Sequence, residues 1–206
     1  MGITGADAQF YALAGVATLL LLGTVWYFRQ QARQTRHQRH VERVIDRLGV
    51  DYHRDIVLPD GIDGLAFIDY LLLTPAGLIV LDVEHCRGHL FGGETVDQWS
   101  QVVDNKTYKF PNPLYANQTH CQAVLWNLSA LHPGDGDANR ERVHGWVVFD
   151  NAGDFPKGIP ARVSSIDRLK ADLAQWLNHP GPVDEQARAD WKQLQQISLD
   201  ARAEMG

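Results

Sequence analysis

The clearest hydrophobic pattern along the chain is a pair of apolar runs near its middle. Ile68–Leu73 and Leu78–Val83 are separated by the four residues Thr-Pro-Ala-Gly at positions 74–77. Proline pre-sets a turn and glycine supplies a positive φ, so this stretch predicts a hairpin between two buried strands. If Leu73 pairs with Leu78, the residues further from the turn are fixed in register as well.

The rest of the pattern predicts alternating strands and helices. Val41, Val44, Ile45 and Leu48 recur at helical spacing, and Gly49 is a suitable C-cap. Along the chain we expect a helix from Gln30 to Leu48, a strand from Tyr52 to Leu58, the hairpin, a short strand and tight turn around Gly88–Gly93, a long helix opened by Pro113, a surface loop at His132–Arg142, a strand at Val143–Phe149, a helix ending near Leu177, and an amphipathic C-terminal helix within residues 183–206.

The N-terminal region has the pattern of a membrane anchor. Phe10–Phe28 is a run of 19 residues without a charge, with aromatic residues at both ends. About 20 such residues span a bilayer core, and aromatic residues favour its two interfaces. A signal peptide would carry its basic region before the apolar run, and a buried core helix would usually show a polar face. We therefore predict a single transmembrane helix at residues 10–28.

The charge on either side of this helix predicts its orientation. Residues 1–9 carry no Lys or Arg, whereas the juxtamembrane segment 29–40 carries Arg29, Arg33, Arg36 and Arg39. The positive-inside rule then places the short N-terminus outside and the globular part in the cytoplasm. The expected location is the inner (cytoplasmic) membrane of a bacterial type of cell. The two cysteines, Cys86 and Cys121, fit a reducing cytoplasm.

Three acidic residues interrupt the two apolar strands. Asp69 lies in the first strand, and Asp82 and Glu84 lie two apart at the end of the second, on one face. The hairpin register would place Asp69 opposite Asp82. Carboxylates in apolar strands are costly unless they are paired or bind a cation, and converging oxygens suit Mg²⁺. The alternatives are an arginine partner for Asp69 and a simple strand end at Asp82 and Glu84.

Composition argues against a broad cationic surface. The residues after His40 carry 15 Lys and Arg against 24 Asp and Glu, a formal charge of −9. Because nucleic-acid affinity depends largely on cationic contacts, this balance lowers the expectation of a phosphate-bearing partner unless a metal or a basic groove acts locally.

Other chemistries find little support in the sequence. His85, Cys86, His89, His120 and Cys121 match no standard zinc spacing. No P-loop, GxGxxG or GxSxG motif is present. Cys121 and His144 can be written as a nucleophile and a base, but nothing near either residue supports that pairing.

Several separated pieces together resemble one family, the nuclease-related domain (NERD), which belongs with the PD-(D/E)XK nuclease-like fold. The likeness covers roughly Val41 to Leu177, within a domain expected at residues 41–178. Its pieces are, in order, Glu42 with Ile45 and Leu48, Ile68-Asp69, the run Gly77–Asp82, Gly88, Gly92, Trp99, Asn112-Pro113-Leu114, His120, and the strand Gly145–Phe149. The resemblance implies an α/β fold with a central mixed β-sheet flanked by helices, as in restriction endonucleases.

The resemblance also implies a metal site. In that fold, an acid on the first helix, an acid on one strand and an acid-x-lysine pair on the next strand surround Mg²⁺ or Mn²⁺. Carried over, these positions are Glu42, Asp69, Asp82 and Glu84, so a glutamate stands where the family has lysine. The family's glutamine position is Ala116, with Gln118 nearby.

Two functions follow from this departure. In the first, Asp69, Asp82 and Glu84 hold the metal, Glu42 supports them, and the protein is a metal-dependent phosphodiesterase acting on nucleic acid. In the second, the chemistry is lost and the domain recruits a protein or a nucleic acid to the membrane, with the C-terminal helix available to a protein partner. Lys106 or Lys109 could replace the missing lysine from a loop, and His85 could act as a base. Solvated loop lysines and a surface histidine at a strand end are the simpler interpretations.

Overall fold

The structure is a computed structural model that describes residues 38–150 and 153–205. The chain divides into two compact units, Met1–Arg43 and Val44–Gly206. Residues 38–46 form a helix, and the turn after it ends at Gly49, whose φ is 75°. The predicted membrane segment, residues 10–28, lies outside the described residues. Within the described part, no helix combines the length and the apolar character that crossing a bilayer requires.

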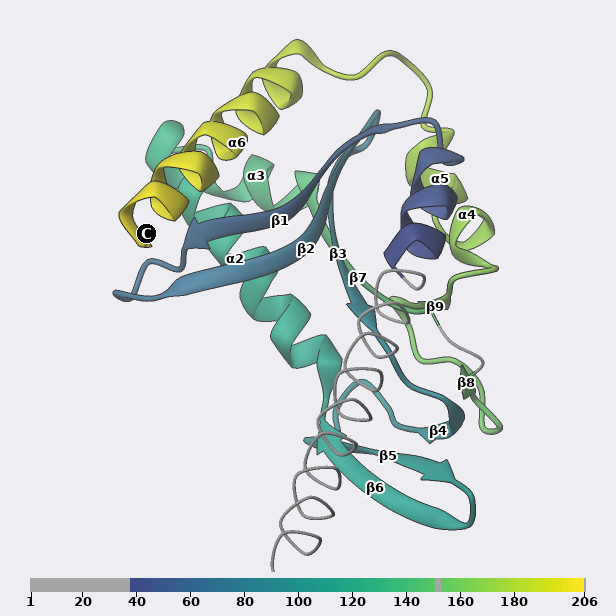
Figure 1. The fold of residues 1–206 in the computed structure, drawn as a ribbon. Coiled ribbons are helices and arrows are strands. Elements are labelled where there is room, and N and C mark those ends of the chain that lie inside the picture. The colour runs from purple at the N-terminus through teal and green to yellow at the C-terminus, as the bar shows by residue number, and fades with distance from the viewer. Residues whose placement is uncertain (1–37, 151–152, 206) are drawn as a thin grey trace, which may run out of the picture. The chain divides into compact units, whose positions relative to one another are not determined.

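The larger sheet has five strands in the order β1-β2-β3-β7-β9 (Figure 1). β1, β2 and β3 pair antiparallel, whereas β3, β7 and β9 pair parallel, so the sheet is mixed as expected. The strands run over Asp51–Pro59 (β1), Leu65–Thr74 (β2), Gly77–Glu84 (β3), Val143–Phe149 (β7) and Val163–Ser165 (β9).

The hairpin between β2 and β3 confirms the register predicted from the sequence. Leu73 lies opposite Leu78, and Thr74 lies opposite Gly77. Gly77 has a φ of 123°, and a Cβ there would lie 2.3 Å from the carbonyl oxygen of Arg142. Glycine is therefore needed at this turn both for its backbone conformation and for the close approach of the chain.

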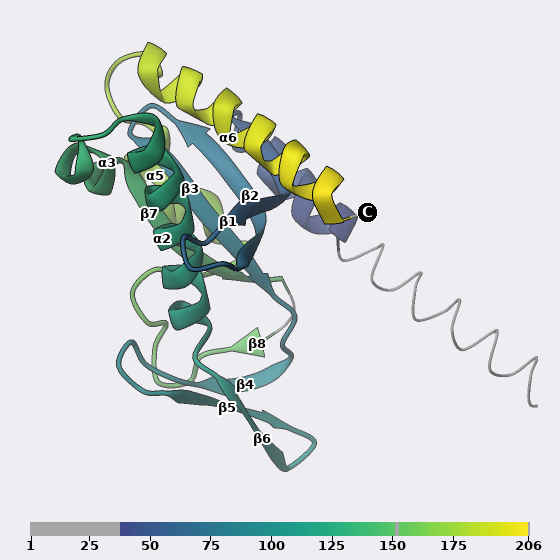
Figure 2. The same cartoon turned by 90° about the vertical axis from the view of Figure 1, so that its left-hand side faces the viewer.

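Helices cover both faces of this sheet. α2 (Pro113–Leu131) and α6 (Glu185–Met205) lie on one face, and the short α4 (Leu169–Asp172) and α5 (Ala174–Leu177) lie on the other (Figures 1 and 2). Pro113 begins α2 as predicted, and the Asn112 side chain caps it by accepting the N–H of Leu114.

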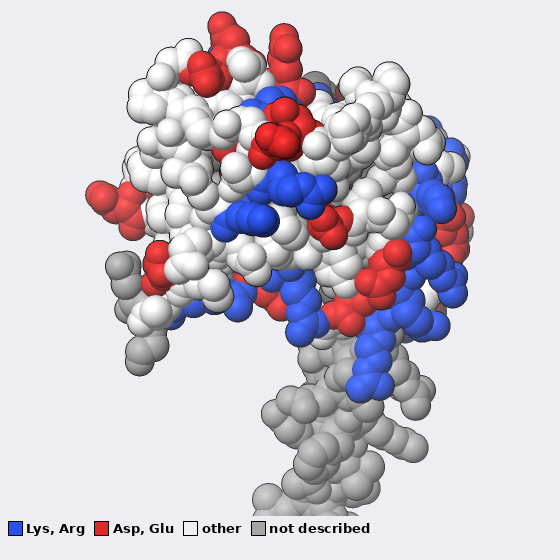
Figure 3. Space-filling view, turned by 90° about the horizontal axis from the view of Figure 1, so that it is seen from above, with Lys and Arg blue, Asp and Glu red and all other residues white. Residues whose placement is uncertain are grey.

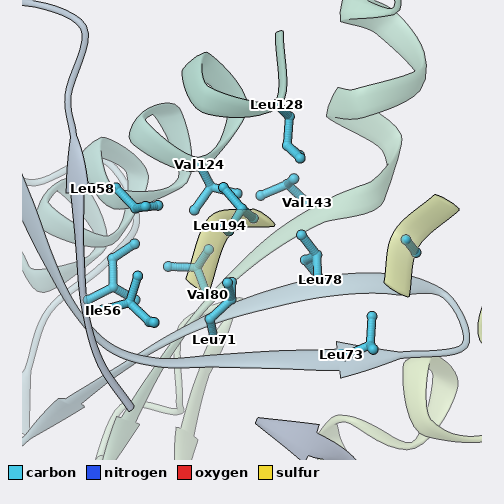
Figure 4. Packing of buried hydrophobic residues seen from close by; sticks show 12 residues of the cluster. Ile56, Leu58, Leu71, Leu73, Leu78, Val80, Val124, Leu128, Val143 and Leu194 are labelled. Carbon is cyan, nitrogen blue, oxygen red and sulfur yellow. The ribbon is translucent and has the colours of Figure 1, made fainter. Parts of the chain in front are cut away.

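The main core fills the space between the sheet and the helices α2 and α6. Figure 4 shows side chains from these three parts packed together. Its buried members from the strands are Ile56, Leu58, Ile68, Leu71, Leu73, Leu78, Val80 and Val143, and those from the helices are Val124, Leu128, Ala187 and Leu194. The alternating apolar positions of the strands and the helical spacing in α2 account for this cluster.

The prediction of a surface loop at His132–Arg142 is wrong for the second half of this segment. Gly136–Arg142 forms a short helix, α3, and Asn139 within it is buried. Asp137 lies in its first turn and Arg142 in its last, which is the favourable arrangement for the helix dipole. The composition of this segment is that of a loop, and only its contact with the domain shows that Asn139 is inside.

A second, smaller sheet has the order β6-β5-β4-β8. β4 (Gly88–Phe91) is the predicted short strand, whereas β5 (Gln98–Val103), β6 (Lys106–Pro111) and β8 (Gly153–Asp154) were not predicted. The β5–β6 turn is formed by Asp104 and Asn105, both with positive φ. Trp99 of β5 is fully buried and stacks on Phe149 of β7 at 6.0 Å between ring centroids, which joins the two sheets. The fold thus has two mixed sheets where the sequence predicted one.

The predicted C-terminal helix is α6, and it packs on the domain itself. Its Asp190 is fully buried. Asp190 Oδ1 lies 2.6 Å from His132 Nε2, and Asp190 Oδ2 lies 3.0 Å from Arg142 Nη2. Its Leu194 lies in the main core, whereas Leu199 is exposed. The apolar face of α6 is therefore largely used within the chain, and a protein partner on this helix stays a prediction.

Candidate active site

The larger sheet forks at the two aspartates that the sequence singled out. β2 and β3 pair from Thr74–Gly77 as far as Tyr70–Leu81. Beyond that pair, Leu65–Ile68 stay with β1, whereas Asp82–Glu84 stay with β7. Figure 1 shows the β1–β2 hairpin and the β3–β7 pair running apart from this point. Two strand edges therefore face each other without a ladder, with an aspartate on each.

The side chain of Asp69 bridges the two separated strands with a hydrogen bond. Its Oδ2 accepts the backbone N–H of Val83 at 2.7 Å, a hydrogen bond that a continuing ladder would otherwise supply. Across β2 on the other side, Asp55 of β1 has a φ of 52° and takes no part in the ladder between the pairs Arg54–Tyr70 and Ile56–Ile68. Both antiparallel ladders of β2 are thus interrupted at Asp69.

Two side chains of α2 form hydrogen bonds with Asp82. Its Oδ2 accepts a hydrogen bond from Asn117 Nδ2 at 2.9 Å and lies 2.8 Å from His120 Nδ1. Asn117 Nδ2 also lies within hydrogen-bond distance of the carbonyl oxygens of Val80 and Trp146. Asn117 and His120 are three residues apart, so they share one face of the helix.

The other oxygen of Asp82 is the most informative atom of the site. Asp82 is only 8% exposed, and its Oδ1 is buried with no hydrogen-bond partner among the described residues. A buried carboxylate oxygen without a donor is costly, and most such atoms in proteins are satisfied. This atom is where a bound cation would find an available ligand.

Gly145 of β7 lets α2 approach the sheet closely enough for these contacts. A Cβ at this position would lie 2.1 Å from Asn117 Oδ1 and 2.8 Å from Cys121 Sγ. Real side chains do not tolerate such distances, so any larger residue would push α2 away. Asn117 and Gly145 together fix the position of Asp82, and sequence analysis gave no role to Asn117. The only local sign was a polar residue on the buried stripe of α2 that also contains Val124 and Leu128.

The pKa values of Asp69 and Glu84 are raised, by burial first and by neighbouring carboxylates second. Burial raises the pKa of Asp69, and the charge of Asp82 adds to this, although the hydrogen bond from Val83 opposes it. Burial also raises the pKa of Glu84, and the charges of Asp69 and Asp82 raise it further. No Lys or Arg is among the charges that shift either pKa. Ionisation of these carboxyl groups is therefore disfavoured, and a divalent cation bound there would favour it.

Two histidines lie beside the acids. Burial lowers the pKa of His120, but the hydrogen bond to Asp82 and the charges of Asp82 and Asp69 outweigh it, so the pKa is raised. His85 Nδ1 lies 2.8 Å from the fully buried side chain of Asp150, and this hydrogen bond raises the pKa of His85. His85 is 60% exposed. The structure thus gives the imidazole a defined orientation, which a solvated strand-end histidine would not have.

The two lysines considered as replacements are not brought to the fork. Lys106 and Lys109 are exposed on β6 of the smaller sheet. Among the described residues no ion pair joins Glu84 to Arg54 or Arg87. Glu42 lies on the helix at 38–46, in the unit Met1–Arg43, so its supporting role stays a prediction.

The side chains of the fork can be compared with the ligands that a divalent metal ion prefers. Asp69, Asp82 and Glu84 supply carboxylate oxygens, the ligands that Mg²⁺ and Mn²⁺ prefer, and the Asp82 Oδ1 atom is buried and unpartnered. No group of three or more His, Cys, Asp or Glu residues converges as a ready-made metal site within the described ranges. The chemistry and the charge of the fork fit such an ion, and its ligands would have to draw together on binding.

The cysteines are not suited to nucleophilic chemistry. Burial raises the pKa of the Cys86 thiol to about 11 and that of the Cys121 thiol to about 12. Both thiols therefore stay protonated at neutral pH, and a protonated thiol is a poor nucleophile. His144 packs against Trp176.

Comparison with known proteins agrees with the resemblance found in the sequence. Residues 33–150, more than half of the chain, match the family model of the nuclease-related domain (NERD). A protein of Bacillus anthracis described as uncharacterized is 27% identical over 75 residues, which are 32% of this chain and 35% of that protein. The match thus spans about a third of that relative. No solved structure matches the chain. The family match is decisive: the chain belongs to the nuclease-related domain family.

Proposed function

We propose that this protein is a divalent-metal-dependent phosphodiesterase that acts on nucleic acid. Two mixed sheets flanked by helices fit a nuclease-like fold, and the family match supports the same class. The observation that carries the proposal is the buried, unpartnered Asp82 Oδ1 at a fork lined by Asp69 and Glu84. Structural roles for these acids would leave that oxygen unexplained.

In this proposal each residue of the fork has a defined task. Asp82 and Asp69 hold Mg²⁺ or Mn²⁺ from the two separated strands, and Glu84 is a third ligand in the place of the family's lysine. When bound, such an ion supplies Lewis-acid polarisation of the phosphoryl group and of water. Asn117 and His120 hold Asp82 Oδ2, so that Oδ1 is left for the ion. His85, oriented by Asp150, is a candidate to move a proton at Nε2.

The second candidate function is a nuclease-fold module without activity that recruits a protein or a nucleic acid. The replacement of lysine by Glu84 and the absence of a ready-made three-ligand group in the described residues favour it. On the face seen in Figure 3, basic and acidic side chains lie interspersed, which is not the surface of a strong nucleic-acid binder. The unpartnered oxygen of Asp82 favours the enzyme.

A calorimetric titration separates the two functions. The full-length chain in detergent micelles is titrated with Mn²⁺ and with Mg²⁺, and the same is done with Asp82→Asn. Wild-type binding that is lost in the variant, followed by cleavage of DNA or RNA only in the presence of the metal, supports the enzyme. Absence of binding by the folded wild type at millimolar metal contradicts it and leaves the recruiting module.

We also propose that residues 10–28 anchor the domain to the inner membrane, with the N-terminus outside. The proposal rests on the 19 uncharged residues and the four arginines that follow them. Extraction of membranes with alkaline carbonate should leave the protein in the pellet, and protease added to spheroplasts should spare the domain. Release of the intact chain by carbonate would contradict the anchor.

A further inference from the structure

A pocket of the domain lies beside the fork but outside it. It has a volume of about 450 Å³ and lies between α2, the start of β7 and the segment at Ala161–Arg162. Small-molecule sites in proteins usually have volumes of about 300–1,000 Å³. Asn117, which donates to Asp82, also lines this pocket, so one side chain separates the pocket from the acids.

Two arginines give the pocket a positive character in an otherwise acidic chain. Arg140 of α3 and Arg162 line it from different segments. Arg140 Nη1 lies 3.5 Å from Asp137 Oδ1, but both side chains are well exposed, so this ion pair is weak. No hydrogen bond or ion pair joins the Arg162 guanidinium to another described residue. The carboxylate of Glu94, also in the lining, accepts the backbone N–H of Ala161 at 2.9 Å and so fixes that wall.

The backbone of Arg162 supports a role for its side chain. Its φ is 60°, a conformation that favours glycine and is uncommon for a long side chain. The carbonyl oxygen of Arg162 accepts the N–H of Val147 at 3.0 Å, so the β7 strand holds the residue in this conformation. Glycine would suit this backbone better, so the arginine at this position favours a role for its guanidinium.

The α2 wall of the pocket is suited to a nucleobase. Gln118 and Gln122 are one turn apart on the helix, and Leu114 and Leu125 lie beside them. Carboxamide groups donate and accept hydrogen bonds, as base edges do, and apolar side chains cover the faces of a base. Guanidinium groups bind phosphate oxygens in a bidentate manner. The pocket thus combines phosphate-binding and base-binding groups at the scale of one nucleotide.

We propose that this pocket binds a nucleoside monophosphate unit, with its phosphate on Arg140 and Arg162 and its base against Gln118 and Gln122. Two sources share this chemistry, a free nucleotide and one unit of a single-stranded chain. The second source rests on the proposed function, because a chain held here would pass Asn117 next to the acids. The binding itself does not depend on a metal at the fork.

Arg162→Gly is the decisive variant, because glycine accepts the backbone at this position. The full-length chain is titrated with AMP, GMP, CMP and UMP without metal, and thermal unfolding is followed in parallel. We expect Arg162→Gly to unfold at no lower temperature than the wild type and to bind at least about tenfold more weakly, since a charge-assisted contact is lost. Arg168→Ala removes an exposed arginine outside the pocket and should bind as the wild type does. Failure of all four nucleotides to bind the wild type, or equal binding by Arg162→Gly, overturns the proposal.

Further arms identify the source and keep this proposal separate from the proposed function. A single-stranded pentanucleotide is titrated in the same way. If it binds at least about tenfold more tightly than the mononucleotides, and its binding also depends on Arg162, the natural ligand is one unit of a longer chain. Equal affinities identify a free nucleotide. Asp82→Asn should lose metal binding and keep nucleotide binding, and Arg162→Gly should do the reverse. If the wild type binds nucleotide through Arg162 but neither binds metal nor cleaves, the proposed function fails and the pocket stands.

Discussion

Asp69 reaches across the fork of the sheet to Val83, whose backbone N–H it accepts at 2.7 Å. One side chain thus takes the place of a ladder hydrogen bond at the point where β2 and β3 separate. Near the end of this ladder, the charge of Asp82 adds to the raised pKa of Asp69, and the charges of Asp69 and Asp82 add to the raised pKa of Glu84. This arrangement explains how acids can stand in two otherwise apolar strands, and it leads to four predictions.

Glu84→Lys restores the lysine of the family at a position where this chain has a carboxylate. Because it exchanges a proposed ligand for a cation beside Asp69 and Asp82, we expect divalent-ion binding to weaken at least about tenfold. Metal titration by calorimetry measures the change, and Glu84→Gln, which keeps the size and removes the charge, is the matched comparison. Gain of nucleic-acid cleavage by Glu84→Lys would instead show that the missing lysine had silenced the enzyme.

Gly145→Ala should destabilise the domain through α2. The new Cβ would overlap Asn117 Oδ1 and crowd Cys121 Sγ, so the helix must shift, at a cost of about 1–3 kcal/mol. Urea unfolding measures the loss. Gly93→Ala is the control, because a Cβ at Gly93 meets nothing within 4 Å. Equal stabilities of the two variants would contradict the close approach of α2 to β7.

Asn117→Ala should cost about 1–3 kcal/mol, because it removes the amide that serves Asp82 Oδ2 and the carbonyl oxygens of Val80 and Trp146. Metal affinity should fall as well, since Asp82 is no longer held by this donor. Thr119→Ala, on the exposed side of the same helix, should change neither property. A stable Asn117→Ala protein with normal metal affinity would remove Asn117 from the site.

The raised pKa values at and beside the fork should make stability without metal fall as pH rises, in two windows. The raised pKa values of Asp69 and Glu84 mean that the folded state holds protons that the unfolded state loses, so stability falls as pH rises from the ordinary values of 3.8 and 4.5 through the raised values. The raised pKa values of His85 and His120 have the same sign, with loss beginning above 6.5.

Thermal unfolding from about pH 4 to about pH 8 measures this dependence. Mg²⁺ or Mn²⁺ should raise the unfolding temperature more at the upper end, because the metal binds the ionised carboxylates. The double variant Asp69→Asn with Glu84→Gln should flatten the lower window and abolish the metal effect. An unchanged slope in that variant would show that other groups control it.

The sequence by itself determined the local structure wherever one short pattern decides it. The turn at 74–77 fixed the register that places Leu73 opposite Leu78, because proline restricts φ and glycine permits the positive φ that the turn requires. Pro113 and the helical spacing after it fixed the start of α2. The family motifs identified the acids and the replacement at Glu84, since these depend on residue types at given spacings.

Tertiary structure alone decided how these pieces meet. The contact of Asn117 with Asp82 joins residues 35 positions apart and depends on the missing side chain at Gly145, which no local pattern reveals. The fork arises because β2 and β3 each stay with a different neighbour, and pairing between distant strands is not encoded in either strand. The β5–β6 hairpin and α3 were missed for a related reason. Their sequences are polar, and only long-range burial of Trp99 and Asn139 makes them regular.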